Sequence, residues 1–288
     1  MLELLQTSPT TLTICVVLLG LCVGSFLNVV AYRLPKIMEQ EFRRDARAFL
    51  QLPERPERVA YTLSSPPSTC PGCGVRIRPW HNLPVAGWLI LRGRCAACSQ
   101  RISIEYPVIE LLTAILSVGC VWRFGYSPQL LGALALTWAL IALTVIDLHT
   151  MYLPDSITLP LLWLGLLLSL SPVFADPASA IVGAALGYLL LWSLFWAFKL
   201  LTGKEGMGYG DFKLLAALGA WMGWQALPQI LLLSAVVGAS VGLLLMAARR
   251  AEWSSKIPFG PYIAGAGWIA LIWGQTINQT YLGIAGVQ

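Results

Sequence analysis

The chain has 288 residues, of which 57% are hydrophobic and only 11% are charged. About a quarter of the residues in a soluble globular protein are charged, so this composition excludes a soluble enzyme, a disordered tail and a coiled coil. It indicates a polytopic membrane protein. The formal net charge of +5 does not predict a nucleic-acid partner, because the basic residues are concentrated in one stretch.

The first apolar run covers about residues 11–34. It does not resemble a cleaved signal peptide, because the residues before it carry no cation and the run is too long. It also contains Gly24, Ser25 and Asn28. We therefore expect residues 1–34 to form a first transmembrane helix.

Residues 35–104 are predicted to form an extramembrane domain, since twelve of the 19 cations lie between Arg33 and Arg101. Two CxxC pairs fall in this stretch: Cys70, Cys73, Cys95 and Cys98. Four thiolates at this spacing suit tetrahedral Zn²⁺ in a closed structural site. Two redox CxxC pairs and a chance arrangement are the alternatives. Metal binding would also stabilise a domain too small to bury much core.

Seven further apolar runs are predicted in residues 105–288, each about 16 to 24 residues long, near the length that crosses ~30 Å of hydrocarbon. They cover about 105–122, 129–147, 156–174, 178–201, 212–227, 229–248 and 258–277. The predicted fold is therefore all-α, with about eight transmembrane helices and a small zinc-ribbon-like domain between helices one and two.

Basic short loops favour the cytoplasmic side of a membrane, and each crossing changes the side. If residues 35–104 are cytoplasmic, so are the loops at 147–156, 200–212 and 249–257. The cations in or beside these loops are Lys199, Lys204, Lys213, Arg249, Arg250 and Lys256, whereas the opposite loops carry only Arg123. The prediction is a cytoplasmic zinc domain with both termini on the far side.

Small residues recur four apart in these runs, as Gly20/Gly24, Gly183/Gly187, Gly219/Gly223 and Gly238/Gly242. Such pairs let helix backbones approach closely in lipid. We expect them to pack within the chain, with a dimer face as the alternative.

Carboxylates near the membrane mark functional sites by default, and Asp147, Asp155 and Asp211 fall at the ends of predicted runs. Asp155 and Asp211 precede helices, where an aspartate can act as an N-cap. For Asp155 we favour the cap. Asp211 follows a glycine-rich segment with Gly208 and Gly210, which is more than a cap requires and would let another chain approach.

Asp147 is predicted at the carboxyl end of its helix, where the helix dipole opposes an anion. If Asp147 and Asp211 meet at one membrane face, they could hydrolyse a peptide bond by acid/base catalysis. We expect Asp147 to hold the proton and Asp211 to be ionised, although the proton could equally be shared.

These motifs together resemble the type IV prepilin peptidases, which are bifunctional leader peptidase/N-methyltransferases. The resemblance covers nearly the whole chain. The matching segments are Gly24 to Pro35, the two CxxC pairs, Ile146 to Asp155, Gly208 to Lys213 and Pro258 to Tyr262. The Gly-x-Gly-Asp element is also similar to that of presenilin-type intramembrane aspartyl proteases.

The resemblance implies that Asp147 and Asp211 form the catalytic pair, supported by Asp155, Gly208, Gly210 and Lys213. It implies prepilin or pseudopilin substrates with a basic leader, cleaved at the cytoplasmic face of the bacterial inner membrane. It also implies methylation of the new N-terminal amine with S-adenosylmethionine. No methyl-donor motif is evident. Residues 36–65 are rich in Arg, Glu and Pro and are expected to form a helix and a linker, but they have no assigned role. Residues 105–288 would then be the peptidase domain.

Two other classes remain as alternatives. A proton-coupled transporter should place its acids near the membrane midplane between broken helices, whereas these acids lie at run ends. An assembly scaffold would explain the zinc ribbon but would leave Asp147 uncompensated.

Overall fold

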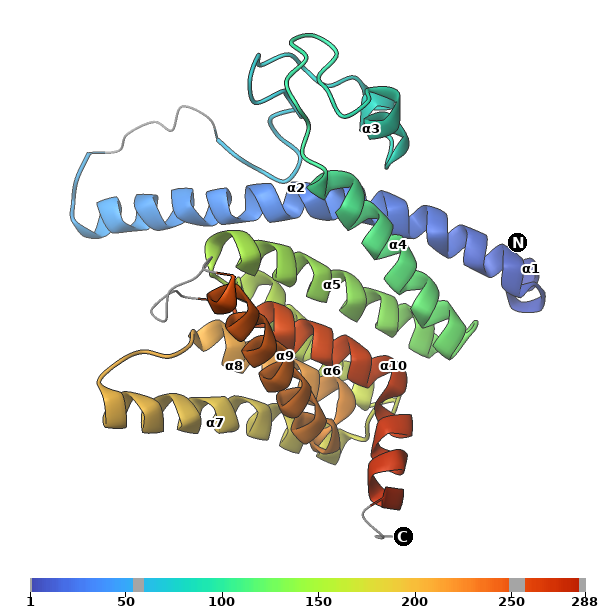
Figure 1. The fold of residues 1–288 in the computed structure, drawn as a ribbon, viewed down its shortest axis with the longest axis vertical. Helices are drawn as coiled ribbons and strands as arrows, with labels where there is room; N and C mark the ends of the chain where they lie inside the picture. The colour runs from blue at the N-terminus through green and yellow to red at the C-terminus, as the bar shows by residue number, and fades with distance from the viewer. Residues whose placement is uncertain (1, 54–59, 249–256, 285–288) are drawn as a thin grey trace. The chain divides into compact units, whose positions relative to one another are not determined.

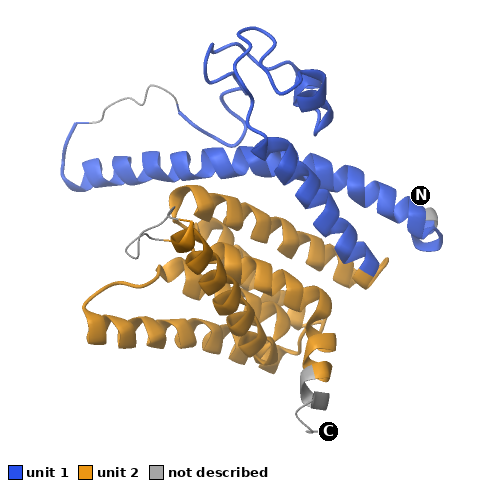
Figure 2. Cartoon of the chain, viewed as in Figure 1, with its two compact units in different colours: residues 1–122 blue, residues 123–288 orange. Residues whose placement is uncertain are grey.

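The computed structural model describes residues 2–53, 60–248 and 257–284 (Figure 1). Its regular elements in these ranges are helices, accompanied by two isolated antiparallel bridges. The chain divides into two compact units, residues 1–122 and residues 123–288 (Figure 2). The all-α prediction is confirmed.

Unit 1 is built on a long helix, α2. Its elements are α1 (Leu2–Thr7), α2 (Pro9–Phe49), η1 (Pro79–Asn82), α3 (Ala86–Ile90) and most of α4 (Glu105–Phe124). The Ser8 side chain caps α2 by accepting the Thr11 N–H. The helix continues through Pro35 instead of ending near residue 34, because a proline removes one helical hydrogen bond without forbidding the helix beyond it. Part of the region left without a role is therefore helical.

The α2 and α4 helices cross in close contact at two of the predicted glycines. A Cβ atom at Gly24 would lie 2.7 Å from the Cα of Glu110, and one at Gly20 would lie 2.9 Å from the Cα of Ala114. Only glycine permits this backbone approach.

Within α2, the buried Arg33 guanidinium donates hydrogen bonds to the carbonyl oxygens of Thr62, Leu63 and Pro66. These hydrogen bonds hold residues 62–66 against the helix.

Unit 2 surrounds one buried helix, α8. Its elements are α5 (Pro128–Thr150), α6 (Asp155–Ser169), α7 (Pro177–Thr202), α8 (Tyr209–Met222), η2 (Trp224–Ala226), α9 (Leu227–Ala247) and α10 (Gly260–Ile284). Ten of the fourteen residues of α8 are buried, including Trp221. The Trp221 Nε1 donates to the Leu161 carbonyl oxygen on α6 at 2.8 Å, which satisfies a polar group that would be costly to bury alone.

The remaining glycine pairs also face helices of the same chain. A Cβ atom at Gly187 would lie 2.7 Å from the Leu215 carbonyl oxygen on α8, and one at Gly238 would lie 3.1 Å from the Tyr262 ring on α10. The observed packing is therefore the intramolecular one that we expected.

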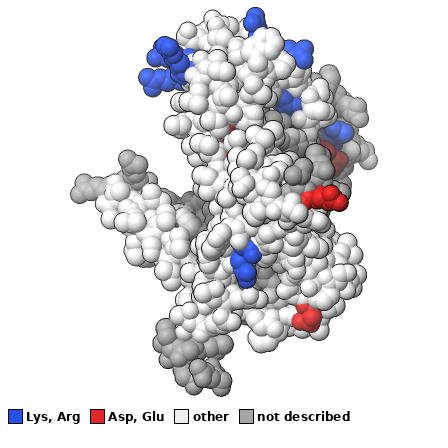
Figure 3. Space-filling view, turned by 90° about the vertical axis from the view of Figure 1, so that its right-hand side faces the viewer, with Lys and Arg blue, Asp and Glu red and all other residues white. Residues whose placement is uncertain are grey.

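All eight predicted runs coincide with helices. Among the residues that the structure describes, five helical segments are long and apolar enough to cross a membrane. These are Pro9–Phe49, Glu105–Phe124, Pro128–Thr150, Pro177–Thr202 and Trp224–Ala247. The α6 helix is apolar but has only 15 residues. The α8 helix is about 21 Å long, too short to cross ~30 Å alone. Eight crossings therefore stay a prediction, whereas a multi-pass membrane protein is supported. Figure 3 shows a surface with few charged side chains.

Two predictions, the membrane orientation and the domain boundaries, are not tested by the described residues. The cations Arg249, Arg250 and Lys256, used for the orientation, lie outside the described residues. The compact units separate at 122/123, whereas the functional division was predicted at 34/35 and 104/105. Compactness does not assign a function, so that division stays a prediction.

Candidate active site

Asp147 is buried in the last turn of α5, with 5% of its surface exposed. Its Oδ2 accepts the backbone N–H of Gly260 at 3.0 Å, and Gly260 is the first residue of α10. The amino end of α10 therefore offsets the unfavourable dipole of α5 at this acid. A Cβ atom at position 260 would lie 2.6 Å from Asp147 Oδ2, so only glycine allows this approach.

Asp211 is buried in the first turn of α8, with 7% of its surface exposed. Its Oδ2 accepts the N–H of Gly208, the N-cap residue, at 3.3 Å. An acid three residues after the N-cap commonly takes this bond. Asp211 thus has a capping role in the structure in addition to any chemistry.

The side chain of Leu153 joins the surroundings of the two acids. Leu153 is 4% exposed and lies in the short connection between α5 and α6. A Cβ atom at Gly210 would lie 2.7 Å from the Leu153 Cβ, and one at Gly260 would lie 3.2 Å from its Cδ1. The residue before Asp211 and the residue bonded to Asp147 therefore flank one side chain. The two carboxyl groups are close enough that the charge of Asp147 acts on Asp211.

The glycines before Asp211 are not equivalent. A Cβ atom at Gly208 would meet nothing closer than 3.9 Å, whereas one at Gly206 would lie 3.1 Å from the Phe198 ring. Only Gly210 is held in tight contact beside the acid. The three alternating glycines were expected to keep the backbone slim. Packing within this chain requires the absence of a side chain mainly at Gly210.

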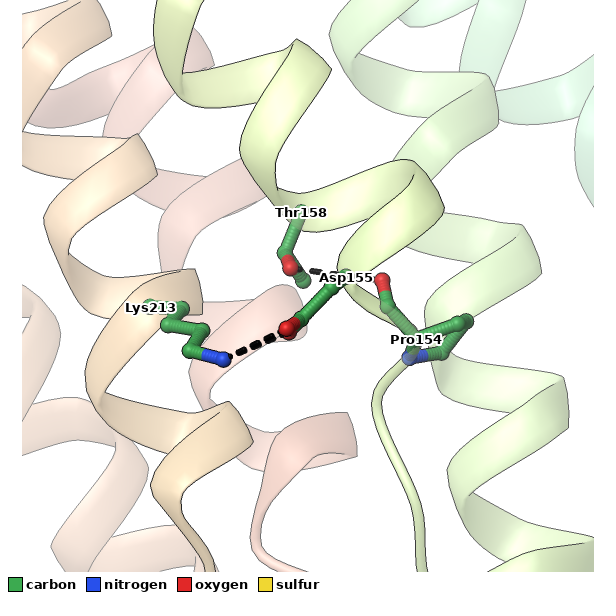
Figure 4. A network of polar contacts seen from close by, with 4 residues as sticks. All are labelled: Pro154, Asp155, Thr158 and Lys213. Carbon is green, nitrogen blue, oxygen red and sulfur yellow. Dashed lines mark hydrogen bonds and ion pairs between the residues drawn. The ribbon is translucent and has the colours of Figure 1, made fainter. Parts of the chain in front are cut away.

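The predicted N-cap role of Asp155 is wrong. Pro154 occupies the N-cap position of α6, and Asp155 is the first helical residue. Both Asp155 carboxylate oxygens instead accept from the Lys213 Nζ, each at 2.7 Å, as Figure 4 shows. Lys213 stands two residues after Asp211 on α8, so it points away from that acid. A full positive charge from a second helix is a stronger partner for the carboxylate than backbone N–H groups.

The predicted distribution of the proton between the acids rested on their own helices alone. In the structure each acid accepts one backbone N–H at the amino end of a helix. That similarity reduces the asymmetry on which the prediction depended. A proton on Asp147 and a proton shared by the pair therefore both stay predictions.

The two CxxC pairs, which we call knuckles, bring their four cysteines together at one point in unit 1. Their sulfur atoms all lie within 4.8 Å of one another, and the Cys70 and Cys98 sulfurs are 3.7 Å apart. For Zn–S bonds of about 2.3 Å, a tetrahedral site separates its sulfurs by about 3.8 Å. The cluster could thus hold a metal ion, an arrangement that two independent redox pairs would not need.

The two knuckles have the same backbone hydrogen bonds. The N–H of Gly74 bonds to the Cys70 carbonyl oxygen, and the N–H of Ser99 bonds to that of Cys95. Backbone N–H groups of Cys98 and Ala97 lower the pKa of the Cys95 thiol to about 6. Those of Cys73 and Gly72 lower the pKa of Cys70. The backbone N–H groups therefore favour the thiolate, the form that binds metal, at Cys70 and Cys95. At Cys98 the Gln100 N–H lowers the pKa, but the neighbouring cysteine side chains and burial raise it to about 12.

One buried acid escaped the sequence analysis. Glu110 lies in α4 with 7% of its surface exposed, inside a run that was considered only for its length. The available signal was a glutamate within an apolar helix long enough to cross a membrane.

Comparison with known proteins gives a consistent family. The family description "Bacterial Peptidase A24 N-terminal domain" matches residues 18–124, and "Type IV leader peptidase family" matches residues 134–243. No solved structure matches the chain.

Three similar curated proteins carry the name prepilin leader peptidase/N-methyltransferase. The one from Pseudomonas aeruginosa is 52% identical, with 99% of each chain covered. That from Aeromonas hydrophila is 53% identical with 98% of each covered, and that from Xanthomonas campestris is 48% identical with 94% of each covered. This chain therefore belongs to the type IV leader peptidase family.

Proposed function

We propose that this protein is a membrane aspartic endopeptidase and N-methyltransferase in which Asp147 and Asp211 hydrolyse the leader peptide bond of prepilins. The observation that carries the assignment is the pair of buried acids held around Leu153. They come from helices far apart in the sequence, and both lie at helix ends. A transporter would instead be expected to carry its acids near the membrane midplane.

The geometry suits hydrolysis by acid/base catalysis. In both acids Oδ2 accepts a backbone N–H, and among the described residues no partner is assigned to either Oδ1. One ionised acid can take a proton from water, which then attacks the scissile carbonyl carbon. The protonated partner can donate to the developing oxyanion and then to the leaving amine.

The substrate has a basic leader and an apolar stem, with glycine before the cut and usually phenylalanine after it. A leader that remains in the cytoplasm brings the scissile bond to the membrane interface. We propose that the acids act there, at the cytoplasmic face of the bacterial inner membrane. Their positions at the ends of α5 and α8 support this proposal, as does the basic character of residues 35–104.

The Asp155–Lys213 ion pair supports the site from outside. It joins the first turn of α6 to the first turn of α8, and Leu153 stands two residues before Asp155. We propose that the pair acts as a positioning contact that keeps Leu153 against Gly210. Lys213 bonds to Asp155 and not to the catalytic acid, so a direct part in proton transfer is not needed.

Zinc is the proposed metal of the cysteine cluster, and its role is structural. Cys70, Cys73, Cys95 and Cys98 would complete a closed tetrahedral site with no open position for substrate. The metal would supply folding free energy to residues 60–104, whose regular structure is limited to two short helices and two bridges.

S-adenosylmethionine is the proposed methyl donor, and it supplies a methyl group activated by a sulfonium. The product amine starts an apolar stem and so stays at the membrane interface after cleavage. Methylation of a membrane-held amine therefore needs groups close to the helices that enter the bilayer.

A prepilin peptide with detergent-solubilised protein tests the assignment, with cleavage and methylation followed by mass spectrometry. Asp147→Asn and Asp211→Asn should each abolish cleavage. Glu205→Gln makes the same chemical change at an exposed acid and should cleave normally. Cleavage by either aspartate variant at the wild-type rate would rule out the catalytic pair.

A further inference from the structure

Glu110 is an acid that the peptidase pair does not use. It is the sixth residue of α4, a helix long and apolar enough to cross a membrane, and it is 7% exposed. At 1.5 Å per residue it lies about 8 Å along the helix from its first residue. Ionisable groups in such helices are rare and point to function.

The partners that the described residues give Glu110 are neutral. Its Oε2 accepts the N–H of Val85 at 2.7 Å, and the Ser25 hydroxyl donates to the same carboxyl group. Buried charges are normally paired with an opposite charge. A carboxylate held only by neutral donors therefore still has an electrostatic demand for a cation.

The Val85 contact also carries backbone strain. Val85 has φ 58° and ψ −50° immediately before α3, a conformation that a β-branched residue rarely adopts. This conformation directs the Val85 N–H at the Glu110 carboxylate. Strained residues of this kind persist where the surrounding structure holds them, often at functional sites.

Polar side chains on α2 face the same part of α4. Ser25, Asn28, Tyr32 and Lys36 repeat at helical spacing and so share one face. The Asn28 amide donates to the carbonyl oxygen of Tyr106 at 3.2 Å, one turn before Glu110. Tyr32 and Lys36 lie near enough to Tyr106 for their charges to act on it. Together with Glu110, these residues form what we call the α2/α4 polar cluster.

We propose that the α2/α4 polar cluster is the site of amine methylation, where the Glu110 carboxylate binds the new α-ammonium group of the cleaved substrate and takes its proton. The proposal rests on the proposed function and goes beyond it by assigning residues of unit 1 to the second activity. The peptidase acids, their glycines and the Asp155–Lys213 pair all belong to unit 2.

The reaction balances with the residues and the donor class already named. Glu110 takes one proton from the ammonium, which frees the nitrogen lone pair. A new N–C bond forms to the methyl carbon, and the C–S bond breaks with its electron pair left on sulfur. The products are a secondary ammonium, the neutral thioether and a protonated Glu110, which returns its proton to solvent.

The cluster also suits a cationic donor. The Lys36 Nζ lies 3.6 Å from the centroid of the Tyr32 ring and 5.2 Å from that of the Tyr61 ring. These rings therefore already accept a cation at their faces, and a sulfonium is attracted by the same electrostatics. The residues present thus fit both reactants of a methyl transfer.

Other ionisable groups around Glu110 define what its titration would report. On α2 these are Tyr32 and Lys36, and on α4 they are Glu105 and Tyr106. The segment before α3 contributes the Val85 N–H. It also contains His81, whose carbonyl oxygen packs against Gly87 at the start of α3. Glu105 is the matched acid for a control because it lies on the same helix and is only partly buried.

The first experiment measures binding without any methyl donor. The probe is a peptide with the mature prepilin N-terminus, either with a free α-amine or N-acetylated, added to the full-length protein in detergent. Because hydrogen bonds to charged groups are strong, wild-type protein should prefer the free amine by about tenfold or more. Glu110→Gln keeps an acceptor for Val85 but no charge, so this preference should disappear. Glu105→Gln should retain it.

The second experiment follows methylation against pH in the same variants. Glu110→Gln should cleave prepilin normally but methylate slowly at neutral pH. Its methylation should rise toward the wild-type rate at about pH 9, because an α-amine with a pKa near 8 then loses its proton unaided. A merely structural defect would not be rescued by alkali.

The outcomes separate the two proposals. Wild-type protein that neither cleaves nor methylates would refute the proposed function. Wild-type protein active in both, with Glu110→Gln retaining the amine preference or the normal pH profile of methylation, would overturn the assignment of Glu110. If Glu110→Gln lowers cleavage and methylation together, the amine preference decides: its loss supports the proposal and its retention refutes it.

Discussion

One added methyl group at position 210 should damage the active site far more than the same group two residues earlier. In Gly210→Ala the new Cβ would lie 2.7 Å from the Leu153 Cβ and 3.4 Å from its Cγ and Cδ1. Leu153 is buried, and its Cβ is fixed to the backbone, so a change of rotamer cannot relieve the contact. The connection between α5 and α6 must move instead.

The expected size of the effect follows from this geometry. Overpacking of a buried position costs about 1–3 kcal/mol, and alanine regains about 1 kcal/mol of helix propensity over glycine. Stability should therefore fall by at most about 2 kcal/mol. Activity should fall more, because a shift of about 1 Å in a catalytic group can reduce the rate roughly 100-fold. Leu153 also touches Gly260, so the shift reaches the partner of Asp147.

Gly208→Ala is the matched control. Its Cβ would have no neighbour closer than 3.9 Å, and φ −88° with ψ 154° is open to alanine. Alanine at an N-cap costs about 1 kcal/mol or less relative to glycine, so the two variants should have similar thermal stability in detergent. Cleavage of a prepilin peptide should then be within a few-fold of wild type for Gly208→Ala. Equal cleavage by both variants would refute the role given to Leu153.

Three further predictions concern the other parts of the molecule. Gly260→Ala should abolish cleavage while methylation of an already cleaved peptide continues, since the new Cβ would displace the Asp147 carboxylate; normal cleavage would contradict the reported contact. Lys213→Met and Asp155→Asn should each lower the cleavage rate about tenfold and change the free energy of unfolding by less than about 1 kcal/mol, as for a partly exposed ion pair. The exchanged pair, Asp155→Lys with Lys213→Asp, should recover part of the cleavage rate. No recovery would show that either residue contacts the substrate directly. Removal of metal by a chelator, checked by elemental analysis at one zinc per chain, should expose residues 69–101 to limited proteolysis, and unchanged protection would show that the cysteine cluster does not depend on metal.

The sequence predicted the helices well because apolar length is a direct physical requirement of the bilayer. It failed where a long-range partner decides the outcome. A helix was expected within residues 36–65, but its continuity with the first helix through Pro35 was missed because the apolar pattern stops at that point. The role of Asp155 was misassigned because Lys213, 58 residues later, is invisible to local capping rules.

In the candidate site, too, local sequence signals were readable and long-range partners were not. The types and positions of Asp147 and Asp211 were readable from their motifs, since an acid at the end of an apolar run is unusual. The Gly260 N–H comes from 113 residues away, and it changes the electrostatic argument about Asp147. Glu110 was readable in principle, because a single glutamate in an apolar helix demands an explanation. Its contact with Val85 was not.

The most direct test of the central claim is the rate of prepilin cleavage, as kcat/KM, for Asp147→Asn, Asp211→Asn and the double variant. Residues that act as one unit show strongly non-additive losses. We therefore expect each single variant to lose at least roughly a thousandfold, and the double variant to lose no more than either one. Losses that multiply in the double variant, or cleavage retained by one single variant, would contradict a shared catalytic pair.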